Sequence, residues 1–264
     1  MDDVDFLITK AVSLLKMAHH VVALTGAGVS TPSGIPDFRS PESGLWEQVD
    51  SMEVASLSGF LRRPQTFYDW IYPLAKLTAA AQPNAAHRAL AQLEADGWLQ
   101  CIITQNIDML HTKAGSQLVY EVHGHMREVT CMQCQRVYAG EPVLTQFLQT
   151  AVVPHCEVCA GVLKPNIILF GELLPQTIMA AADWHTAHCD VMLVAGSSLE
   201  VLPVSQLPWQ ARRNGARLII INYGETYADE WADVVIHANV ADVLPRIAAA
   251  LSTGDITSMA HHSE

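Results

Sequence analysis

Apolar residues recur along this chain in short runs that are separated by segments with helical spacing. Residues 5–19 carry apolar positions at helical spacing, and the run Val21–Leu24 that follows predicts a short buried strand ending in a Gly-containing turn. Further strand-like runs come at Cys101–Thr104, Leu118–Val122, Ile167–Phe170, Val191–Ala195, Arg217–Ile221 and Val234–His237. Short apolar strands that alternate with helices are typical of a parallel sheet covered on both faces. We therefore predict an α/β fold with a doubly wound, Rossmann-like parallel sheet.

Two stretches interrupt this alternation and predict a smaller domain made of two insertions. Residues 41–83 have a helical, aromatic-rich pattern without a strand run, and residues 124–165 contain four closely paired cysteines. The Rossmann-like domain is then formed by residues 1–40, 84–123 and 166–251. The polar tail at 252–264 is expected to be disordered.

Composition and charge exclude several classes of protein. Half of the 264 residues are hydrophobic and 16% are charged, as in ordinary globular proteins, and no apolar run approaches the roughly 18 residues of a membrane span. The acidic N-terminus does not resemble a targeting segment, so we expect a cytoplasmic location and no membrane partner. The net charge of −12 argues against direct nucleic-acid binding and favours basic partners such as lysine-rich protein segments, although acidity often serves only solubility.

The paired cysteines predict a metal site in the second insertion. Cys131 and Cys134 form one CxxC pair, and Cys156 and Cys159 form another. In a reducing compartment such pairs indicate metal before disulfide, and four thiolates fill a tetrahedral zinc site. Because no coordination position stays open, we predict one structural Zn²⁺ and a zinc-ribbon insertion. Two disulfides or simple buried thiols are the rival interpretations, and sensitivity of the fold to a chelator would decide between them.

A Gly-containing segment follows the first predicted strand, where exposed backbone N–H groups could meet phosphates. It runs from Gly26 to Ser40 and places glycines at 26, 28 and 34. This spacing is not GxGxxG, so the fingerprint of hydride-transferring Rossmann enzymes is absent. Taken alone, the segment fits a tight turn as well as a nucleotide site.

The Gly26–Ser40 segment resembles the signature of the sirtuins, the NAD-dependent protein deacylases, and further blocks match in the family's order. The resemblance extends from about Val21 to Leu244, and details of the later blocks are similar to the bacterial and archaeal deacetylases. The further blocks are Thr104–Asp108, His123-Gly124, Pro165–Glu172, Gly196–Val201 and the segment around Asn222.

The resemblance implies a reaction in which NAD is consumed. The acyl oxygen of a modified lysine attacks C1′ of the nicotinamide ribose and nicotinamide leaves. The catalytic residues are then His123 as general base, with Asn106 and Asp108 orienting the ribose and the carboxamide. A lone histidine at the end of a strand is more often structural, and Asn106 and Asp108 alone would indicate an Asx turn.

The resemblance also assigns contacts with NAD and with an acetylated lysine-containing protein or peptide. The peptide is expected to insert as an extra strand between the segments around 168–171 and 199–201. Lys164 stands where arginine is common in the family, and it is not among the expected substrate contacts. The expected NAD contacts are Gly26, Ala27, Gly28, Thr31, Asp37, Phe38, Arg39, Gln105, Asn106, Ile107, Asp108, His123, Gly196, Ser197, Ser198, Asn222, Tyr223, Gly224 and Val240. The expected substrate contacts are Ile168, Phe170, Gly171 and Val201.

One position bears on the acyl group that is removed. Relatives that remove acidic acyl groups carry a Tyr-x-x-Arg pair, and here Ile71 stands where that arginine would be, after Tyr68. We therefore expect uncharged short acyl groups to be preferred. Mono-ADP-ribosyl transfer to protein and a non-catalytic NAD-sensing module are the alternative functions.

Overall fold

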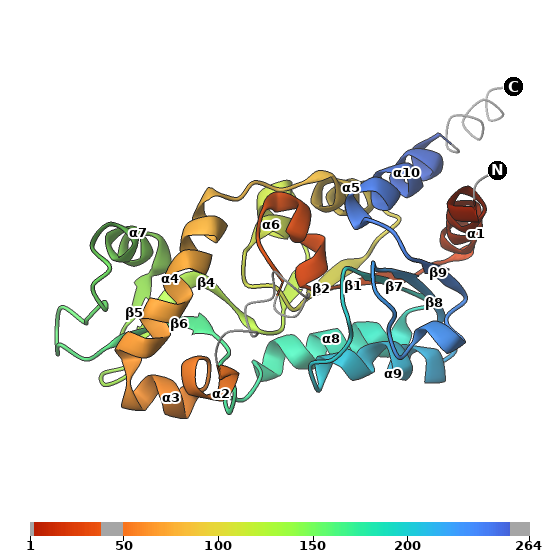
Figure 1. The fold of residues 1–264 in the computed structure, drawn as a ribbon. Coiled ribbons are helices and arrows are strands. Elements are labelled where there is room, and N and C mark those ends of the chain that lie inside the picture. Colours follow the sequence, from red (N-terminus) through yellow and green to blue (C-terminus); the bar gives the residue numbers. More distant parts are fainter. Residues whose placement is uncertain (1–2, 38–49, 254–264) are drawn as a thin grey trace, which may run out of the picture.

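The computed structural model of the chain describes residues 3–37 and 50–253 and builds them on two separate sheets (Figure 1). The larger sheet has six strands in the order β3-β2-β1-β7-β8-β9, and every neighbouring pair is parallel. Its strands are β1 (Val21–Thr25), β2 (Cys101–Thr104), β3 (Val119–Glu121), β7 (Val191–Ala195), β8 (Arg217–Ile221) and β9 (Val234–Ile236). The predicted doubly wound α/β fold is confirmed.

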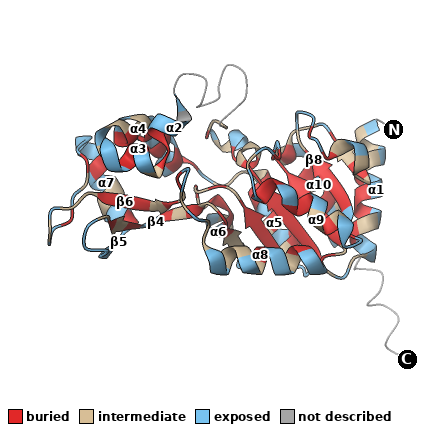
Figure 2. Ribbon diagram, turned by 90° about the horizontal axis from the view of Figure 1, so that it is seen from below, coloured by how far each residue is buried: buried red, intermediate tan, exposed pale blue. Residues whose placement is uncertain are grey.

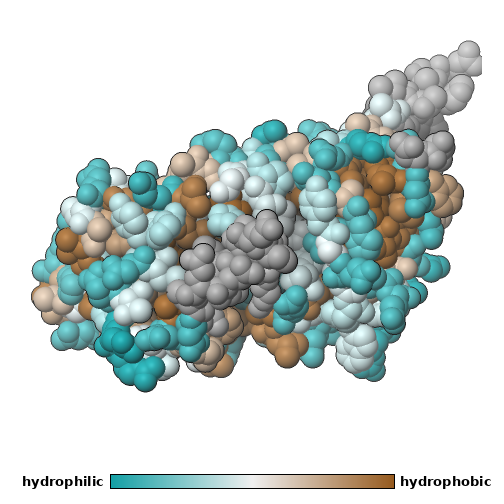
Figure 3. All heavy atoms as spheres, viewed as in Figure 1, coloured by the Kyte–Doolittle hydropathy of each residue, from teal (hydrophilic) through white to brown (hydrophobic). Residues whose placement is uncertain are grey.

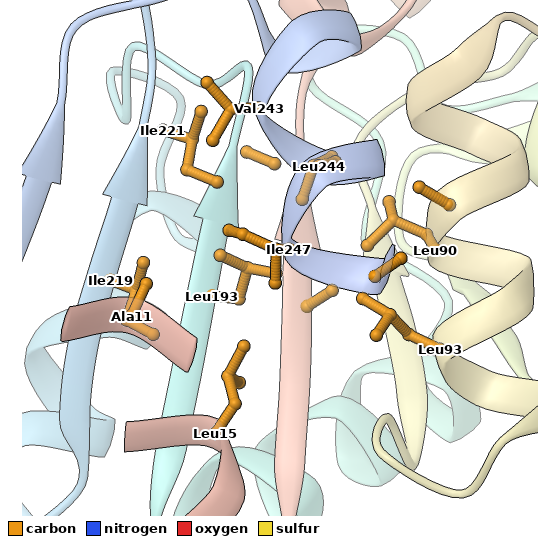
Figure 4. Packing of buried hydrophobic residues seen from close by; sticks show 14 of the residues in the cluster. Ala11, Leu15, Leu90, Leu93, Leu193, Ile219, Ile221, Val243, Leu244 and Ile247 are labelled. Carbon is orange, nitrogen blue, oxygen red and sulfur yellow. The ribbon is translucent and has the colours of Figure 1, made fainter. Parts of the chain in front are cut away.

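Helices cover both faces of the parallel sheet because its strands are apolar on both faces. On one face α1 (Asp3–Met17), α5 (Ala85–Ala95) and α10 (Val240–Ser252) pack against alternate strand residues, among them Leu193 and Ile219 (Figure 4). The residues between these point to the opposite face and pack with α8 (Gln176–His188) and α9 (Leu207–Arg213). Figure 2 shows the strands of this sheet as buried beneath the helices.

The smaller sheet is antiparallel and holds the paired cysteines. It consists of β4 (Gly124–Cys131), β5 (Val137–Ala139) and β6 (Leu163–Ile167) in the order β5-β4-β6, with α7 (Gly140–Thr150) between β5 and β6 in the chain. Helices α2 (Ser51–Val54), α3 (Leu57–Arg62) and α4 (Pro64–Ala80) complete this part, and aromatic side chains form much of its core. The core rings include Phe60, Phe67, Tyr68 and Phe147.

One strand prediction was wrong. A strand was expected over Ile167–Phe170 in the parallel sheet, but β6 ends at Ile167 and belongs to the small sheet. The apolar run was misleading because residues 168–170 form a connecting segment outside both sheets. Ile168 N donates to His123 O at 2.8 Å, and Phe170 forms an isolated β-bridge with Ser56.

The remaining elements are short and lie near the ends of strands. They are the helix α6 (Leu110–Ala114) and 3₁₀ helices at Ala27–Val29, Thr31–Ser33, Val204–Gln206 and Asp229–Trp231. Within residues 3–37 and 50–253, no helix is both long enough and apolar enough to cross a bilayer. The face seen in Figure 3 is largely hydrophilic, with hydrophobic side chains in separate patches.

Candidate active site

A cavity of about 820 Å³ opens at the carboxyl ends of four neighbouring strands. The residue that directly follows each of β1, β2, β7 and β8 lines this cavity. These four residues are Gly26, Gln105, Gly196 and Asn222. Ligands of open α/β sheets bind at this edge, and the volume is in the usual range for small-molecule sites.

The cavity brings together every predicted NAD and substrate residue that the structure describes. Phe38 and Arg39 were also predicted and lie outside the described residues. The lining includes Gly26, Ala27, Gly28, Thr31, Asp37, Gln105, Asn106, Ile107, Asp108, His123, Ile168, Phe170, Gly171, Gly196, Ser197, Ser198, Val201, Asn222, Tyr223, Gly224 and Val240.

The glycines after β1 lie in close contact with the turn that follows β7. Gly26 N donates to Ala195 O at 3.3 Å and Gly28 N donates to Gly196 O at 2.9 Å, so neither N–H group points to a ligand. A Cβ on Gly28 would lie 2.9 Å from Gly196 Cα, and one on Gly26 would lie 2.9 Å from Ser197 Cβ. Glycine is therefore required for packing between the turns that follow β1 and β7.

A buried hydrogen-bond network fixes the polar side chains of the cavity. Ser30 Oγ donates to Asp108 Oδ2 at 2.7 Å and accepts from Asn106 Nδ2 at 3.1 Å. Asn106 Nδ2 also donates to Gly26 O at 3.0 Å, and Asp108 Oδ1 accepts from Leu110 N at 2.8 Å. Burial raises the pKa of Asp108, and its hydrogen bonds partly oppose that rise. Ser30 was not among the predicted site residues, although it joins two of them.

Behind this network lie two buried histidines that the sequence did not single out. His87, in the first turn of α5, accepts from Asn84 N at 3.4 Å through Nδ1, so its Nε2 carries the hydrogen and faces Ser30 Oγ at 3.4 Å. Burial lowers the pKa of His87 to about 4 and lowers that of His111 well below its usual value. His111 Nε2 lies 2.9 Å from Thr25 Oγ1, and the two imidazole rings are 4.8 Å apart. Both rings therefore support the site in the neutral form.

His123 lies in the turn between β3 and β4 with one ring nitrogen already committed. Its Nδ1 is 3.1 Å from Gln105 O, and because a carbonyl oxygen only accepts, Nδ1 carries the hydrogen. In the neutral ring the lone pair is then on Nε2, the arrangement a general base needs. Burial lowers the pKa of His123, and the bond to Gln105 partly opposes this. The ring is thus neutral and oriented at neutral pH.

Other predicted residues at the strand ends are held by side-chain hydrogen bonds. Gln105 Nε2 donates to Ser197 Oγ at 3.0 Å, and Asn222 Nδ2 donates to Gly224 O at 2.8 Å. Val240 is the first residue of α10, whose N-cap is formed by Asn239. The turns after β2, β7 and β8 therefore form one ordered wall of the cavity.

The segment after β6 forms the opposite wall, and Lys164 holds it in place. Lys164 is buried, and its Nζ donates to Ile167 O at 2.8 Å, to Pro165 O at 3.0 Å and to Glu172 Oε2 at 3.0 Å. The same carboxylate oxygen of Glu172 accepts from Leu169 N at 2.8 Å. This network encloses Ile168, whose N–H is bonded to His123 O. Lys164 thus positions the segment that carries the predicted substrate contacts.

Helix α4 supplies an apolar end to the cavity. Ile71 lines it, together with Trp70 and Leu74, which the sequence reasoning did not select. Tyr68 is turned away, since its hydroxyl donates to Leu163 O at 2.6 Å. Among the described lining residues there is no lysine or arginine. The helical pattern of α4 alone gave no signal for which of its faces would meet the cavity.

The four paired cysteines come together at one end of the small sheet. All four sulfurs lie within 4.8 Å of one another, with Cys131 Sγ 3.4 Å from Cys159 Sγ and Cys134 Sγ 3.6 Å from Cys156 Sγ. Zinc–sulfur bonds of about 2.3 Å in a tetrahedron require sulfurs about 3.8 Å apart, so the cluster could hold one zinc ion. Tyr138 Oη is 3.0 Å from Cys156 Sγ, and this hydrogen bond lowers the pKa of the Cys156 thiol.

Comparisons with known proteins agree with this geometry. The Sir2 family profile matches residues 26–203. The chain is 44% identical over 241 residues to NAD-dependent protein deacylase 2 of Archaeoglobus fulgidus, covering 91% of this chain and 94% of that protein. It is 43% identical over 238 residues to the NAD-dependent protein deacetylase of Sulfolobus acidocaldarius, covering 90% of this chain and 92% of that protein.

Solved structures are similar over the same length. A Sir2 protein with p53 peptide and NAD⁺ matches with a TM-score of 0.84 at 38% identity, covering 95% of this chain and 99% of that one. A Sir2 variant with deacetylated p53 peptide and 3′-O-acetyl ADP ribose matches with a TM-score of 0.87 at 37% identity, covering 92% and 98%. The fold, the extent of the profile match and these relatives show that the chain belongs to the Sir2 family.

Proposed function

We propose that this protein is an NAD-dependent protein-lysine deacetylase that produces deacetylated lysine, nicotinamide and O-acetyl-ADP-ribose. One observation carries the proposal: a single cavity joins the oriented imidazole of His123 to the Asn106–Ser30–Asp108 network at the ends of parallel strands. Relatives at 44% and 43% identity are an NAD-dependent deacylase and a deacetylase, and a related structure holds a deacetylated peptide with O-acetyl ADP ribose.

In this reaction NAD is a substrate. The acyl oxygen of acetyl-lysine attacks C1′ of the nicotinamide ribose, the C1′–N bond breaks, and nicotinamide leaves with the bonding electron pair. The product is an alkylimidate joined to ADP-ribose. His123 Nε2 then accepts the proton of a ribose hydroxyl as that oxygen attacks the imidate carbon, and water completes the release of lysine and O-acetyl-ADP-ribose. Asn106 and Asp108 orient the ribose and the carboxamide, and the hydrogen bonds of Ser30 Oγ to both hold these two side chains in place.

The remaining predicted residues have matching roles in the proposal. The turns after the strands, with Phe38 and Arg39, bind NAD. The peptide adds as an extended strand between the segments 168–171 and 199–201, using Ile168, Phe170, Gly171 and Val201. Uncharged acyl groups are preferred because the described lining of the cavity has Ile71, and no cation, where an acidic acyl group would need a partner.

The four cysteines would hold one structural zinc, which supplies no chemistry to the reaction. Their thiolates, and the free Cys101 and Cys189, suit a reducing compartment such as the cytoplasm. We also propose that the chain is divided into three parts. They are a Rossmann-like NAD-binding domain (1–40, 84–123 and 166–251), a helical insertion (41–83) and a zinc-binding insertion (124–165). The sheet order and the position of the cysteine cluster support this division.

The experiment that tests the function uses an acetyl-lysine peptide with and without NAD. We expect nicotinamide, deacetylated peptide and O-acetyl-ADP-ribose in equal amounts by mass spectrometry. His123→Ala should abolish their formation, whereas His188→Ala, an exposed histidine on α8, is the matched control. ADP-ribosylated protein without deacetylated peptide would favour the transferase alternative, and intact NAD after prolonged incubation would favour a binding module.

A further inference from the structure

A second, shallower groove of about 430 Å³ adjoins the active-site cavity. Leu199, Glu200 and Leu202 line both spaces, so the groove and the cavity share one wall. Leu199 and Glu200 belong to the segment 199–201, along which the acylated peptide is proposed to pair. The other lining residues of the groove are Ser205, Gln206, Trp209 and Tyr227.

The groove exposes large side chains that the proposed reaction does not use. Leu202 is 66% exposed, Trp209 48% and Tyr227 50%. Exposed apolar side chains that gather in one concave place are unusual and often mark a site of interaction. Aromatic rings are also enriched where proteins bind other polypeptides, because they bury a large area and lose little side-chain entropy.

The two aromatic rings of the groove are each held by a contact within the protein. The Tyr227 hydroxyl donates to Ser205 O at 2.5 Å, which ties the ring to another lining residue of the groove. The Arg213 guanidinium lies over the Trp209 ring at 4.7 Å from its centroid. A preformed site costs less ordering entropy on binding, so an apolar side chain can enter with little rearrangement.

We infer, on the basis of the proposed deacetylase function, that the groove is a substrate-selection site for an apolar side chain that flanks the acyl-lysine in the same polypeptide. Continuity with the peptide edge favours this occupant, because a chain leaving the cavity along 199–201 passes the shared wall. The enzyme then recognises two features of its substrate: the acyl-lysine in the cavity, and a leucine-like or aromatic side chain a few residues away.

The test is a positional scan with acetyl-lysine peptides of equal length. Each position from four residues before to four residues after the acetyl-lysine carries leucine in one peptide and glycine in its partner. At one position we expect leucine to raise kcat/KM about tenfold over glycine, mainly through a lower KM, as is usual for filling an apolar pocket. In Trp209→Ala this leucine-to-glycine ratio should fall close to one, and Trp209→Phe should restore part of it.

The control is Trp184→Ala, which removes a tryptophan that is 53% exposed and does not line the groove. It should keep the ratio of the unsubstituted enzyme. Equal kcat/KM for leucine and glycine at every position would overturn the inference while leaving the deacetylase function intact. A ratio that persists in Trp209→Ala would overturn it as well, and so would a dimer that Trp209→Ala dissociates in sedimentation, since a second copy would then occupy the groove. Absence of NAD-dependent turnover of all peptides would instead refute the proposed function.

Discussion

Replacing Lys164 by methionine removes the cation that holds the substrate-binding segment. The side chain of Lys164 is 8% exposed and that of Glu172 is 19% exposed, so the substitution leaves a largely buried carboxylate with one remaining bond, from Leu169 N. Loss of one partner of a buried pair costs about 3–5 kcal/mol. Because water reaches part of Glu172, we expect the lower end, about 3 kcal/mol of unfolding free energy.

The assay combines urea unfolding with steady-state kinetics on an acetyl-lysine peptide. Since the lost bonds fix residues 167–172, KM for the peptide should rise more than kcat falls. Lys164→Arg keeps the charge and should retain most of both properties. In the double variant Lys164→Met/Glu172→Gln no charge remains unpaired, so its loss of stability should be smaller than the sum of the two single losses. A Lys164→Met protein with the stability and peptide KM of the unsubstituted enzyme would refute the reasoning.

Tyr138→Phe removes the hydrogen bond to Cys156 and should speed zinc release to a colorimetric chelator severalfold; an unchanged rate would show that the bond does not stabilise the cluster. Burial lowers the pKa of His123 below 6.5, the ordinary value for histidine, and only the neutral ring is a base. The fall of kcat/KM on acidification should therefore have its midpoint below pH 6.5, and a midpoint above pH 6.5 would contradict this. His87 has a pKa of about 4 when folded, so the unfolded chain takes up this proton first, and between pH 6.5 and 4 this residue alone should lower the unfolding free energy by up to about 1.4 kcal/mol per pH unit of acidification; His87→Gln should show a correspondingly shallower slope in urea titrations. Ile71→Arg should raise desuccinylation relative to deacetylation, and a ratio that stays constant in parallel assays would argue against Ile71 facing the acyl group.

The parallel sheet could be predicted because its central strands β1, β2 and β7 are buried at every position. Runs such as Val191–Ala195 are buried at every position, so a continuous apolar stretch marks them without reference to the rest of the chain. Strand β6 was not predicted because its sequence is not a continuous apolar run. It reads Leu-Lys-Pro-Asn-Ile, and its lysine is buried only because carbonyl groups and Glu172 surround it. That compensation comes from residues on the far side of a turn, and no local pattern records it.

Some residues of the candidate site could also be predicted from the strand pattern, and others could not. Polar residues that directly follow parallel strands, such as Gln105 and Asn222, meet at one edge of the sheet, so their convergence could be inferred from the strand pattern. His87 and His111 lie on helices. The apolar pattern of a helix does not show which of its buried residues will contact Ser30 or Thr25. Their role depends on how α5 and α6 pack, which the sequence does not specify locally.

The position of His123 explains why a zinc site in the smaller sheet bears on catalysis in the larger one. The chain leaves the parallel sheet at Glu121, His123 lies in the turn that follows, and β4 begins at Gly124, which pairs with Ile167 at the end of β6. The base and the substrate segment are therefore both attached to the same β4–β6 pair, and Ile168 N bonds to His123 O across it. The other end of this pair carries Cys131, whose register partner is Leu163. Loss of zinc would free that end of the pair, and the displacement would reach the imidazole and the peptide edge together.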